Sequence, residues 1–262
     1  MYNYFTSNPT LNLVYFTGNS ADIGGGLYNG QSHPVLTDVI FEANYALNEG
    51  GGLANLLSHP VLNNVTFSEN SAHDGAGCAN DQSNPILINA TFSGNDVTMY
   101  GGGMLNTESN PSLTNVPFDA NLADASGGAI IIEKSNSVLT NAILWANSPD
   151  QIVDYDTSST TATYSDVQST VVFPGTGNIN QDPLLVHELL PYDGSFPAMH
   201  ALEEGSLAID VGNPDLASCP ATDQRGVPRP LDGDSEGQKR CDMHTYEFGT
   251  GIIFIFLPLV RR

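Results

Sequence analysis

Apolar residues recur with a period of about 26 positions along the first 147 residues of the chain. The clearest marker is a glycine-rich group whose last residue is Gly26, Gly52, Gly77, Gly103 and then Ala129, at intervals of 26, 25, 26 and 26 residues. An apolar side chain follows each group, at Leu27, Leu53, Cys78, Met104 and Ile130. A period of this length is typical of a solenoid, in which repeats stack and share one core.

Each repeat also contains short alternations such as "PVL" and "VTF", together with two to four glycines and a proline. This composition disfavours helices and favours short strands. We therefore predict an all-β fold, a right-handed parallel β-helix with three short strands per coil, at the "GLYN", "PVL" and "VIF" positions, and about 25 to 26 residues per coil. Leucine, valine and phenylalanine columns, with the side chains that follow the glycine-rich groups, should fill the core, and an asparagine column should form a ladder at the bends. The first apolar column is Leu11, Leu36, Leu62, Leu87, Leu113 and Leu139; the second is Phe16, Phe41, Phe67, Phe92, Phe118 and Leu144; the asparagines are Asn19, Asn44, Asn70, Asn95, Asn121 and Asn147.

The regularity of the repeat divides the chain into four regions. Residues 1–147 form the regular coils, 148–214 are expected to form less regular coils, 215–248 a closing region, and 249–262 an apolar tail. The tail's apolar run is about half as long as a membrane span, so it is either a closing strand or the remnant of an anchor. The chain starts in mid-repeat without a signal peptide, so we expect further N-terminal coils in a longer protein. An uncapped first coil would favour end-to-end association.

The charge of the chain is strongly negative, at -22, with 29 acidic and seven basic residues and no Lys or Arg before Lys134. Such a surface repels nucleic acid and anionic membranes. Among the three cysteines, Cys78 lies alone in a repeat, whereas Cys219 and Cys241 flank one loop. These two could form a disulfide, the alternative being two buried thiols.

The outward positions of the "GLYN" strand are where a β-helix enzyme would carry its chemistry. A polysaccharide lyase would need an Arg or Lys base there, and only Lys134 lies nearby. A glycoside hydrolase would need two or three carboxylates in one cleft. Asp81, Glu108 and Glu133 lie along roughly one edge in successive coils and are the candidates, although solvated surface charge explains them more simply.

Two other sets of residues occupy equivalent repeat positions. His33 and His59 should stack one coil apart, where they could share a metal, but Asn8, Asn84 and Asn110 fill the same position, which favours a turn role. Valine and isoleucine recur in a second set, which would form an apolar stripe for a partner if the side chains point outward. This set is Val35, Val61, Ile86 and Val138.

The segment "DGDSEG" at 232–237 is the most specific ligand signal in the chain. Asp232, Asp234 and Glu236 alternate before a glycine, as in the first half of a calcium loop. Met243 stands where the loop's final Glu is expected, so Asp242 would have to replace it. Calcium is therefore the candidate cofactor, with an acidic surface turn as the alternative. Arg225 and Arg229 are expected to pair with carboxylates such as Asp210 or Asp223.

Short motifs in the repeat resemble those of a known family. "FTGN", "FEAN", "FSEN", "FSGN" and "FDAN", with "GGAI" at 127–130, resemble the FxxN and GGA[ILV] repeats of chlamydial polymorphic membrane proteins over residues 6–147. "GSLAIDVGNP", "CPATDQRGVPRP" and "CDMHTYE" resemble the end of bacterial choice-of-anchor Q type β-helix proteins, with Met243, His244 and Thr245 in place of the usual Ile-Gly-Ala. The resemblance implies export and attachment to the cell surface.

These observations together favour a non-catalytic, exported bacterial surface protein. We expect an extracellular, adhesin-like rod that binds a polysaccharide or a surface protein and is peripheral or anchored rather than membrane-spanning. A polysaccharide lyase or hydrolase is the alternative, and a structural spacer is a third possibility.

Overall fold

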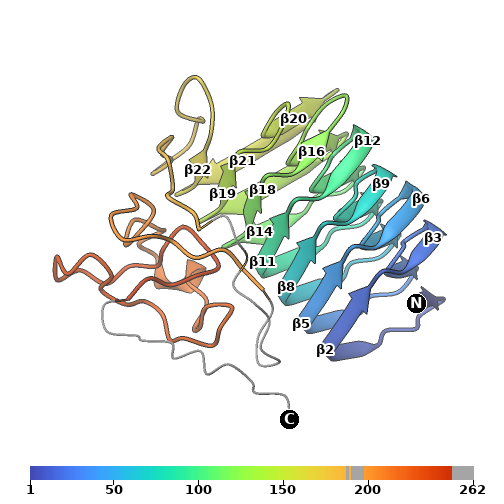
Figure 1. Ribbon diagram of the computed structural model, residues 1–262, viewed down its shortest axis with the longest axis horizontal. Coiled ribbons are helices and arrows are strands. Elements are labelled where there is room, and N and C mark those ends of the chain that lie inside the picture. Colours follow the sequence, from blue (N-terminus) through green and yellow to red (C-terminus); the bar gives the residue numbers. More distant parts are fainter. Residues whose placement is uncertain (187–188, 190–197, 250–262) are drawn as a thin grey trace, which may run out of the picture.

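The computed structural model describes residues 1–186, 189 and 198–249, so the apolar tail at 250–262 lies outside the described residues. The described chain is a stack of coils built from three parallel β-sheets (Figure 1). A single 3₁₀ turn, Leu216–Ser218, is the helical element of this part of the chain. The predicted all-β solenoid with three strands per coil is confirmed.

The three sheets are called A, B and C. Sheet A contains β1 (Tyr2–Tyr4), β4 (Leu27–Gly30), β7 (Leu53–Leu56), β10 (Cys78–Asp81), β13 (Met104–Thr107), β17 (Ile130–Glu133) and β20 (Ile152–Tyr155). Sheet B contains β2 (Thr10–Thr17), β5 (Val35–Glu42), β8 (Val61–Ser68), β11 (Ile86–Ser93), β14 (Ser112–Thr114), β15 (Pro117–Asp119), β18 (Asn136–Thr140), β19 (Ile143–Trp145), β21 (Ser159–Thr163) and β22 (Asp166–Val167). Sheet C contains β3 (Ser20–Ile23), β6 (Tyr45–Glu49), β9 (Ser71–Asp74), β12 (Asp96–Tyr100) and β16 (Leu122–Ala123).

The third strand of each coil does not lie where the sequence pattern predicted it. The "PVL" and "VIF" segments both belong to sheet B and form one eight-residue strand, β5, whose bend at Asp38 has a φ of 54°. The third strand instead follows the asparagine, as in β6. The pattern missed sheet C because its inward side chains are small, as at Ala46 and Ala72, and give little apolar signal.

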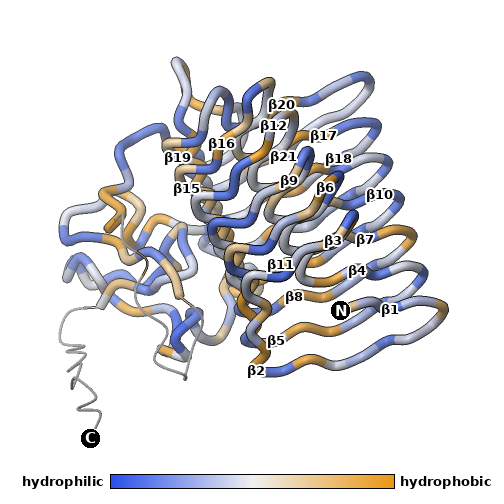
Figure 2. Tube along the Cα trace, turned by 45° about the vertical axis from the view of Figure 1, so that its right-hand side comes forward, coloured by the Kyte–Doolittle hydropathy of each residue, from blue (hydrophilic) through white to orange (hydrophobic). Residues whose placement is uncertain are grey.

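The predicted apolar columns form one continuous core. Their side chains are buried in every coil from β4 to β19, with the phenylalanine rings stacked 4.5 to 4.9 Å apart between centroids. Burying a side chain of this size contributes about 1.5 to 3 kcal/mol. The hydropathy pattern accordingly repeats from coil to coil (Figure 2). The core therefore holds the sheets in fixed register over the length of the stack.

Each glycine in the glycine-rich group has a separate steric reason. Gly50 has a φ of +68°, which L side chains rarely adopt. A Cβ on Gly51 would lie 2.5 Å from the carbonyl oxygen of Ser71 in the next coil, and one on Gly52 would lie 2.7 Å from the oxygen of Gly77. The group thus brings neighbouring coils into close backbone contact at the corner between sheets C and A.

The predicted asparagine ladder is present. Asn70 Oδ1 accepts hydrogen bonds from the backbone N–H and the Nδ2 of Asn44, both at 3.0 Å, and Asn70 Nδ2 donates to the Phe41 carbonyl. The same pattern continues along the column to Asn147, whose Nδ2 donates to Gln151 Oε1. A second ladder, inside sheet A, links Asn3, Asn29, Asn55, Asn80 and Asn106. The bends are therefore held by buried amide chains.

The coils continue through β20, β21 and β22, and the chain then leaves the stack. Within 148–214, these strands form one more coil, whereas residues 198–214 lie beside the stack with the closing region. We call residues 198–249 the lateral segment; it packs on the outer face of sheet B instead of covering the end of the solenoid (Figure 1). Its backbone and side chains bond to Thr66, Thr91, Asn115 and Asn141 of four successive coils.

Candidate functional site

A concave surface lies where the outer face of sheet A meets the ends of the sheet C strands. One wall consists of outward residues of sheet A, including Leu105, Thr107 and Ile131. The other wall is the column of residues that end the sheet C strands, which are Ile23, Glu49, Asp74 and Tyr100. We call this surface the AC groove.

The AC groove contains two cavities that meet at Glu49. The smaller, of about 120 Å³, is lined by Tyr28, Ala54, Leu56 and Asp81 among others. The larger, of about 440 Å³, extends over the later coils to Tyr155. Glu49 lines both, so it lies at the junction of two adjoining spaces. The larger cavity is of the size that small ligands occupy in proteins.

Tyrosines line both cavities, and a further tyrosine, Tyr2, stacks on one of them next to the smaller cavity. Tyr28 lines the smaller cavity, and its ring stacks on Tyr2 at 5.0 Å, while Tyr100 and Tyr155 line the larger. Tyr100 and Tyr155 expose 37% and 39% of their surface, so their rings are available to a ligand. Exposed tyrosines of this kind offer an apolar face and a polar tip. The groove can therefore hold a ligand with apolar faces and many hydroxyl or amino groups.

Carboxylates are the other recurring group in the AC groove. Glu49 and Asp74 are register partners on adjacent strands of sheet C. Partial burial and the neighbouring carboxylates of Asp74 and Asp81 raise the pKa of Glu49. Asp74 is oriented by two contacts, because its Oδ1 accepts from the Tyr100 N–H at 2.9 Å and its Oδ2 lies 2.7 Å from His73 Nδ1.

The three carboxylates that the sequence suggested for hydrolysis are not brought together. Asp81 lines the smaller cavity and Glu133 the larger, both in one outward column of sheet A. Glu108 lies at the exposed corner after β13, with a φ of 48°, and lines neither cavity. Glu49 and Asp74, which the sequence did not suggest, are carboxylates that line the groove in addition to Asp81 and Glu133. A sequence signal for them exists, since each directly precedes a glycine-rich group.

His33 and His59 form part of a turn ladder. Their rings stack 5.1 Å apart, and His33 Nδ1 accepts a hydrogen bond from the His59 backbone N–H at 2.9 Å. Asn8 Oδ1 makes the same bond to His33, and His59 Nδ1 makes it to Asn84. The geometry therefore matches the favoured turn role, in which a backbone hydrogen bond occupies the Nδ1 atom of each ring.

The acidic loop brings together a ligand set that differs from the predicted one. Carboxylate oxygens of Asp210, Asp232 and Asp234 lie within 4.8 Å of one another. Asp242 is buried and is not part of this cluster, because its oxygens accept from the backbone N–H groups of Asp210 and Phe248. Glu236 is exposed and is not part of this cluster. Both oxygens of Asp210 already accept backbone bonds, which leaves Asp232 Oδ1 as the buried oxygen without a partner.

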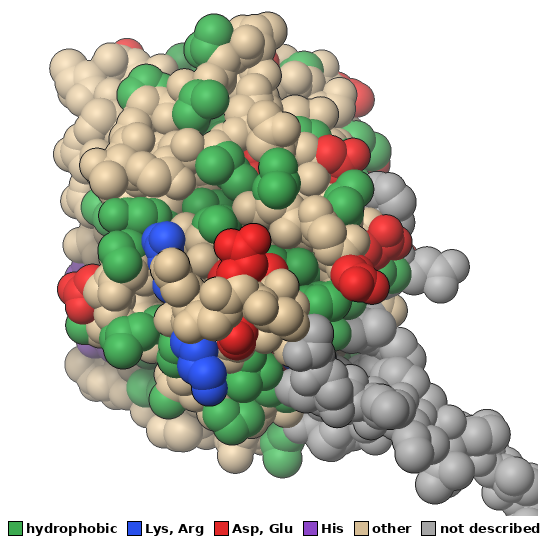
Figure 3. Space-filling view, turned by 90° about the vertical axis from the view of Figure 1, so that its left-hand side faces the viewer, with side chains coloured by type: hydrophobic (Ala, Val, Ile, Leu, Met, Phe, Trp, Pro, Cys, Tyr) green, Lys and Arg blue, Asp and Glu red, His purple; other side chains and the backbone are tan. Residues whose placement is uncertain are grey.

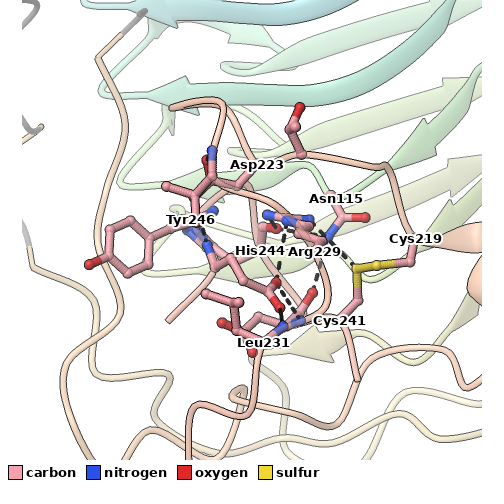
Figure 4. A network of polar contacts seen from close by, with 12 residues as sticks. Asn115, Cys219, Asp223, Arg229, Leu231, Cys241, His244 and Tyr246 are labelled. Atoms are coloured by element: carbon pink, nitrogen blue, oxygen red, sulfur yellow. Dashed lines mark hydrogen bonds and ion pairs between the residues drawn. A yellow bond between two sulfur atoms is a disulfide. The ribbon is translucent and has the colours of Figure 1, made fainter. Parts of the chain in front are cut away.

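The predicted disulfide between Cys219 and Cys241 is present, with the Cα atoms 5.8 Å apart. It lies beside a buried polar network in the lateral segment (Figure 4). Arg229, which is fully buried, lies 3.3 Å from Glu247 Oε2 and donates to the His244 carbonyl. Burial raises the pKa of Glu247 to about 7, although Arg229 opposes this shift.

Asp223 and His244 complete this network. The predicted pairing of Arg225 with Asp223 is confirmed. The buried Nδ1 atom of His244 accepts a hydrogen bond from the Tyr246 N–H at 2.9 Å. The ion pairs and hydrogen bonds of this network link the loops of the lateral segment to one another, although His244 Nε2 is buried without a hydrogen-bond partner among the described residues. On this face of the molecule the few Lys and Arg side chains lie among Asp and Glu (Figure 3).

The apolar stripe formed by Val35, Val61, Ile86 and Val138 points outward. Val35, Ile86 and Val138 expose 41%, 46% and 48% of their surface, and Val61 is half-buried between them. Ser112 interrupts the column. Cys78, in contrast, is fully buried, which raises the pKa of its thiol to about 12 and makes it unreactive.

No family model and no curated protein matches this chain. The described residues include no helix that is both long enough and apolar enough to cross a membrane. The assignment of a function therefore depends on the geometry of the AC groove.

Proposed function

We propose that the protein is an exported β-helix that binds a polysaccharide along the AC groove, in the manner of an adhesin. The observation that carries this proposal is the pair of adjoining cavities with tyrosines and carboxylates in both. They follow the solenoid axis, so successive sugar units of one chain contact successive coils. The seven strands of sheet A extend over about 29 Å at 4.8 Å per strand.

Export to the cell surface or the extracellular space is part of the same proposal. The Cys219–Cys241 disulfide supports it, because disulfides persist in oxidising compartments. The resemblance to bacterial surface repeats and to the choice-of-anchor region supports it as well. The strongly negative charge keeps the rod soluble and away from anionic polymers.

Titration calorimetry against neutral, acidic and amino oligosaccharides tests the binding function. We expect binding to at least one uncharged or cationic class, with a loss of about tenfold or more in Tyr100→Ala, since one buried aromatic contact is worth about 1.5 kcal/mol. Tyr45→Ala is the matched control, because Tyr45 is an exposed tyrosine on β6 that lines neither cavity. Equal losses in both variants, or silence toward all three classes, would overturn the proposal.

Glycoside hydrolysis is a second candidate for the same groove, favoured by the position of Glu49. A general acid must lie where two sugar subsites meet and must have a raised pKa, with a second carboxylate nearby as base. Glu49 lies at that junction, its pKa is raised, and Asp81 faces it from sheet A. Release of reducing ends that Glu49→Gln abolishes and that Glu108→Gln, outside both cavities, retains would establish hydrolysis. Binding without release would exclude it for the sugars tested.

A further inference from the structure

The carboxylates of the AC groove bear on which sugars it accepts. Five line the two cavities, namely Glu49, Asp74, Asp81, Glu133 and Asp156. Among the described residues, none that lines these cavities is a Lys or an Arg. Lys134 lies beside Glu133, with Nζ 4.0 Å from its Oε1, but both side chains are well exposed, and such pairs are weak. The groove therefore has a local excess of negative charge.

Several of these carboxylates have no protein partner to neutralise them. Within the described residues, no hydrogen bond or ion pair engages the side chains of Glu49 and Asp81. Asp74 contacts His73, whose ring is exposed. Burial raises the pKa of Glu49, and the neighbouring carboxylates of Asp74 and Asp81 raise it further against the opposing effect of His73, so the carboxylates repel one another in the groove. A cation between them would relieve this repulsion, and an anionic sugar would increase it.

The tyrosines favour a cation that can also contact an aromatic face. Tyr28 lies in the cavity of Asp81, and Tyr100 lies beside Asp74. An ammonium group attached to a sugar ring satisfies both features, because it donates charge-assisted hydrogen bonds to carboxylates and is attracted to aromatic faces. A free metal ion would use only the carboxylates. An aromatic ring and carboxylates occur together in both cavities of the groove.

Resting on the proposed glycan-binding function, we propose that the AC groove selects polysaccharides of amino sugars whose amino groups are free and protonated. The groove then discriminates between a free amine and its N-acetylated form on the same sugar backbone. Acetylation removes the charge and replaces an ammonium donor with a neutral amide. Acidic polysaccharides are excluded by the same carboxylates.

A matched pair of ligands tests this selectivity. Calorimetry on the full chain at mildly acidic pH compares a β-1,4-glucosamine hexamer with its fully N-acetylated counterpart, at low and at high sodium chloride. We expect the free amine to bind about tenfold tighter or more at low salt and to lose this advantage at high salt, because screening shortens the reach of exposed charges. Equal affinity for the two hexamers overturns the inference.

Variants separate recognition in the groove from attraction to the whole negative rod. Glu49→Gln and Asp81→Asn should each weaken the free-amine hexamer about fivefold or more, while Glu108→Gln, at an exposed corner outside both cavities, should leave it unchanged. An oligolysine of equal charge should respond equally to all three variants. If Glu108→Gln weakens the hexamer as much as Glu49→Gln does, the selectivity is nonspecific and the inference fails.

The outcomes also separate the two proposals from each other. Binding of only neutral or N-acetylated sugars leaves the glycan-binding function in place and overturns the amino-sugar selectivity. Silence toward every sugar overturns both. Circular dichroism of each variant verifies that the fold is retained, so that a lost affinity reports the groove.

Discussion

His33 Nδ1 accepts a hydrogen bond from the backbone N–H of His59, so the His33 ring must carry its proton on Nε2. Partial burial and His33 itself lower the pKa of His59. Folding thus favours the neutral ring, and this contribution is complete above the unfolded pKa of about 6.5 and is lost as the pH falls below it. The corner of the solenoid is therefore sensitive to acid.

Replacing both histidines by asparagine should remove this sensitivity. Asn8 and Asn84 occupy the same position and make the same bond without titrating. We expect His33→Asn/His59→Asn to lose less stability than the wild type when urea unfolding at pH 8 is compared with pH 5. The other titrating groups are common to both proteins, so identical losses would contradict the acid sensitivity of the corner.

Asn70→Ala should be strongly destabilising. The change removes the acceptor of two Asn44 bonds and the donor to Phe41 and Asn95, all of them buried. Orphaned buried polar groups cost about 1 to 3 kcal/mol each, so we expect a loss of roughly 2 to 5 kcal/mol in urea unfolding. Asn84→Ala, in an exposed turn ladder, should cost about 1 kcal/mol or less. Comparable losses in the two variants would show that the buried ladder contributes no more to the free energy of unfolding than the exposed one.

Asp166→Asn should stabilise the protein at neutral and alkaline pH. Burial raises the pKa of Asp166 to about 7, and its Oδ2 is buried without a partner. The folded state therefore holds a proton that the unfolded chain releases near pH 4, and stability falls as the pH rises from about 4 to 7. We expect a gain on the order of 2 to 4 kcal/mol at pH 8 and none at pH 4, measured by urea unfolding. A gain of equal size at both pH values would rule out titration as its cause.

Reduction of the Cys219–Cys241 disulfide should lower stability by about 3 kcal/mol, as expected for a closed loop of this length. Dithiothreitol should shift the thermal midpoint of the wild type and leave Cys219→Ser/Cys241→Ser unaffected. Cys78→Ala is the control, since the buried thiol of Cys78 is unpaired and its removal should leave the response to reductant unchanged. A wild type insensitive to reductant would contradict the prediction.

Calcium, expected from the sequence of the acidic loop, should raise the thermal midpoint by roughly 3 °C when present at about ten times its dissociation constant. Asp232→Asn should abolish this shift, because Asp232 Oδ1 is the unpaired buried oxygen of the cluster. Glu236→Gln should retain it, because that side chain lies outside the cluster. Equal shifts in all three proteins would place the ion elsewhere, and no shift in the wild type would end the calcium interpretation.

Much of the fold could be predicted from the sequence because its signal is periodic. One phenylalanine per coil, as at Phe41 and Phe67, and one asparagine per coil, as at Asn44, recur at fixed spacing, and identical environments require identical residues. Sheet C escaped prediction because alanines such as Ala46 fill its narrow interior. The repeat period therefore predicted the position of the core but did not predict the strands of sheet C.

The candidate site was harder to predict for a different reason. Ile23, Glu49, Asp74 and Tyr100 occupy one column but differ in side chain, so the repeat marks their position before the glycine-rich group and not a shared chemical role. Their meeting with Asp81 depends on the corner at the glycine-rich group, which is a property of the backbone path. The position of the lateral segment was equally hidden, since Gln224 contacts Thr91 across 133 residues of sequence.

The attachment of the lateral segment changes how the solenoid should come apart. In a plain stack each coil is stabilised only by contacts with its neighbours, so the stack unfolds coil by coil from its ends. Here a single segment bonds to Thr66, Thr91, Asn115 and Asn141, so four successive coils must open together or not at all. Within the part of the chain that the structure describes, the first two coils make no hydrogen bond to the lateral segment. Amide hydrogen exchange along the rod is thus expected to be graded, with a slow, cooperative block at the later coils and rapid local opening toward the N-terminus.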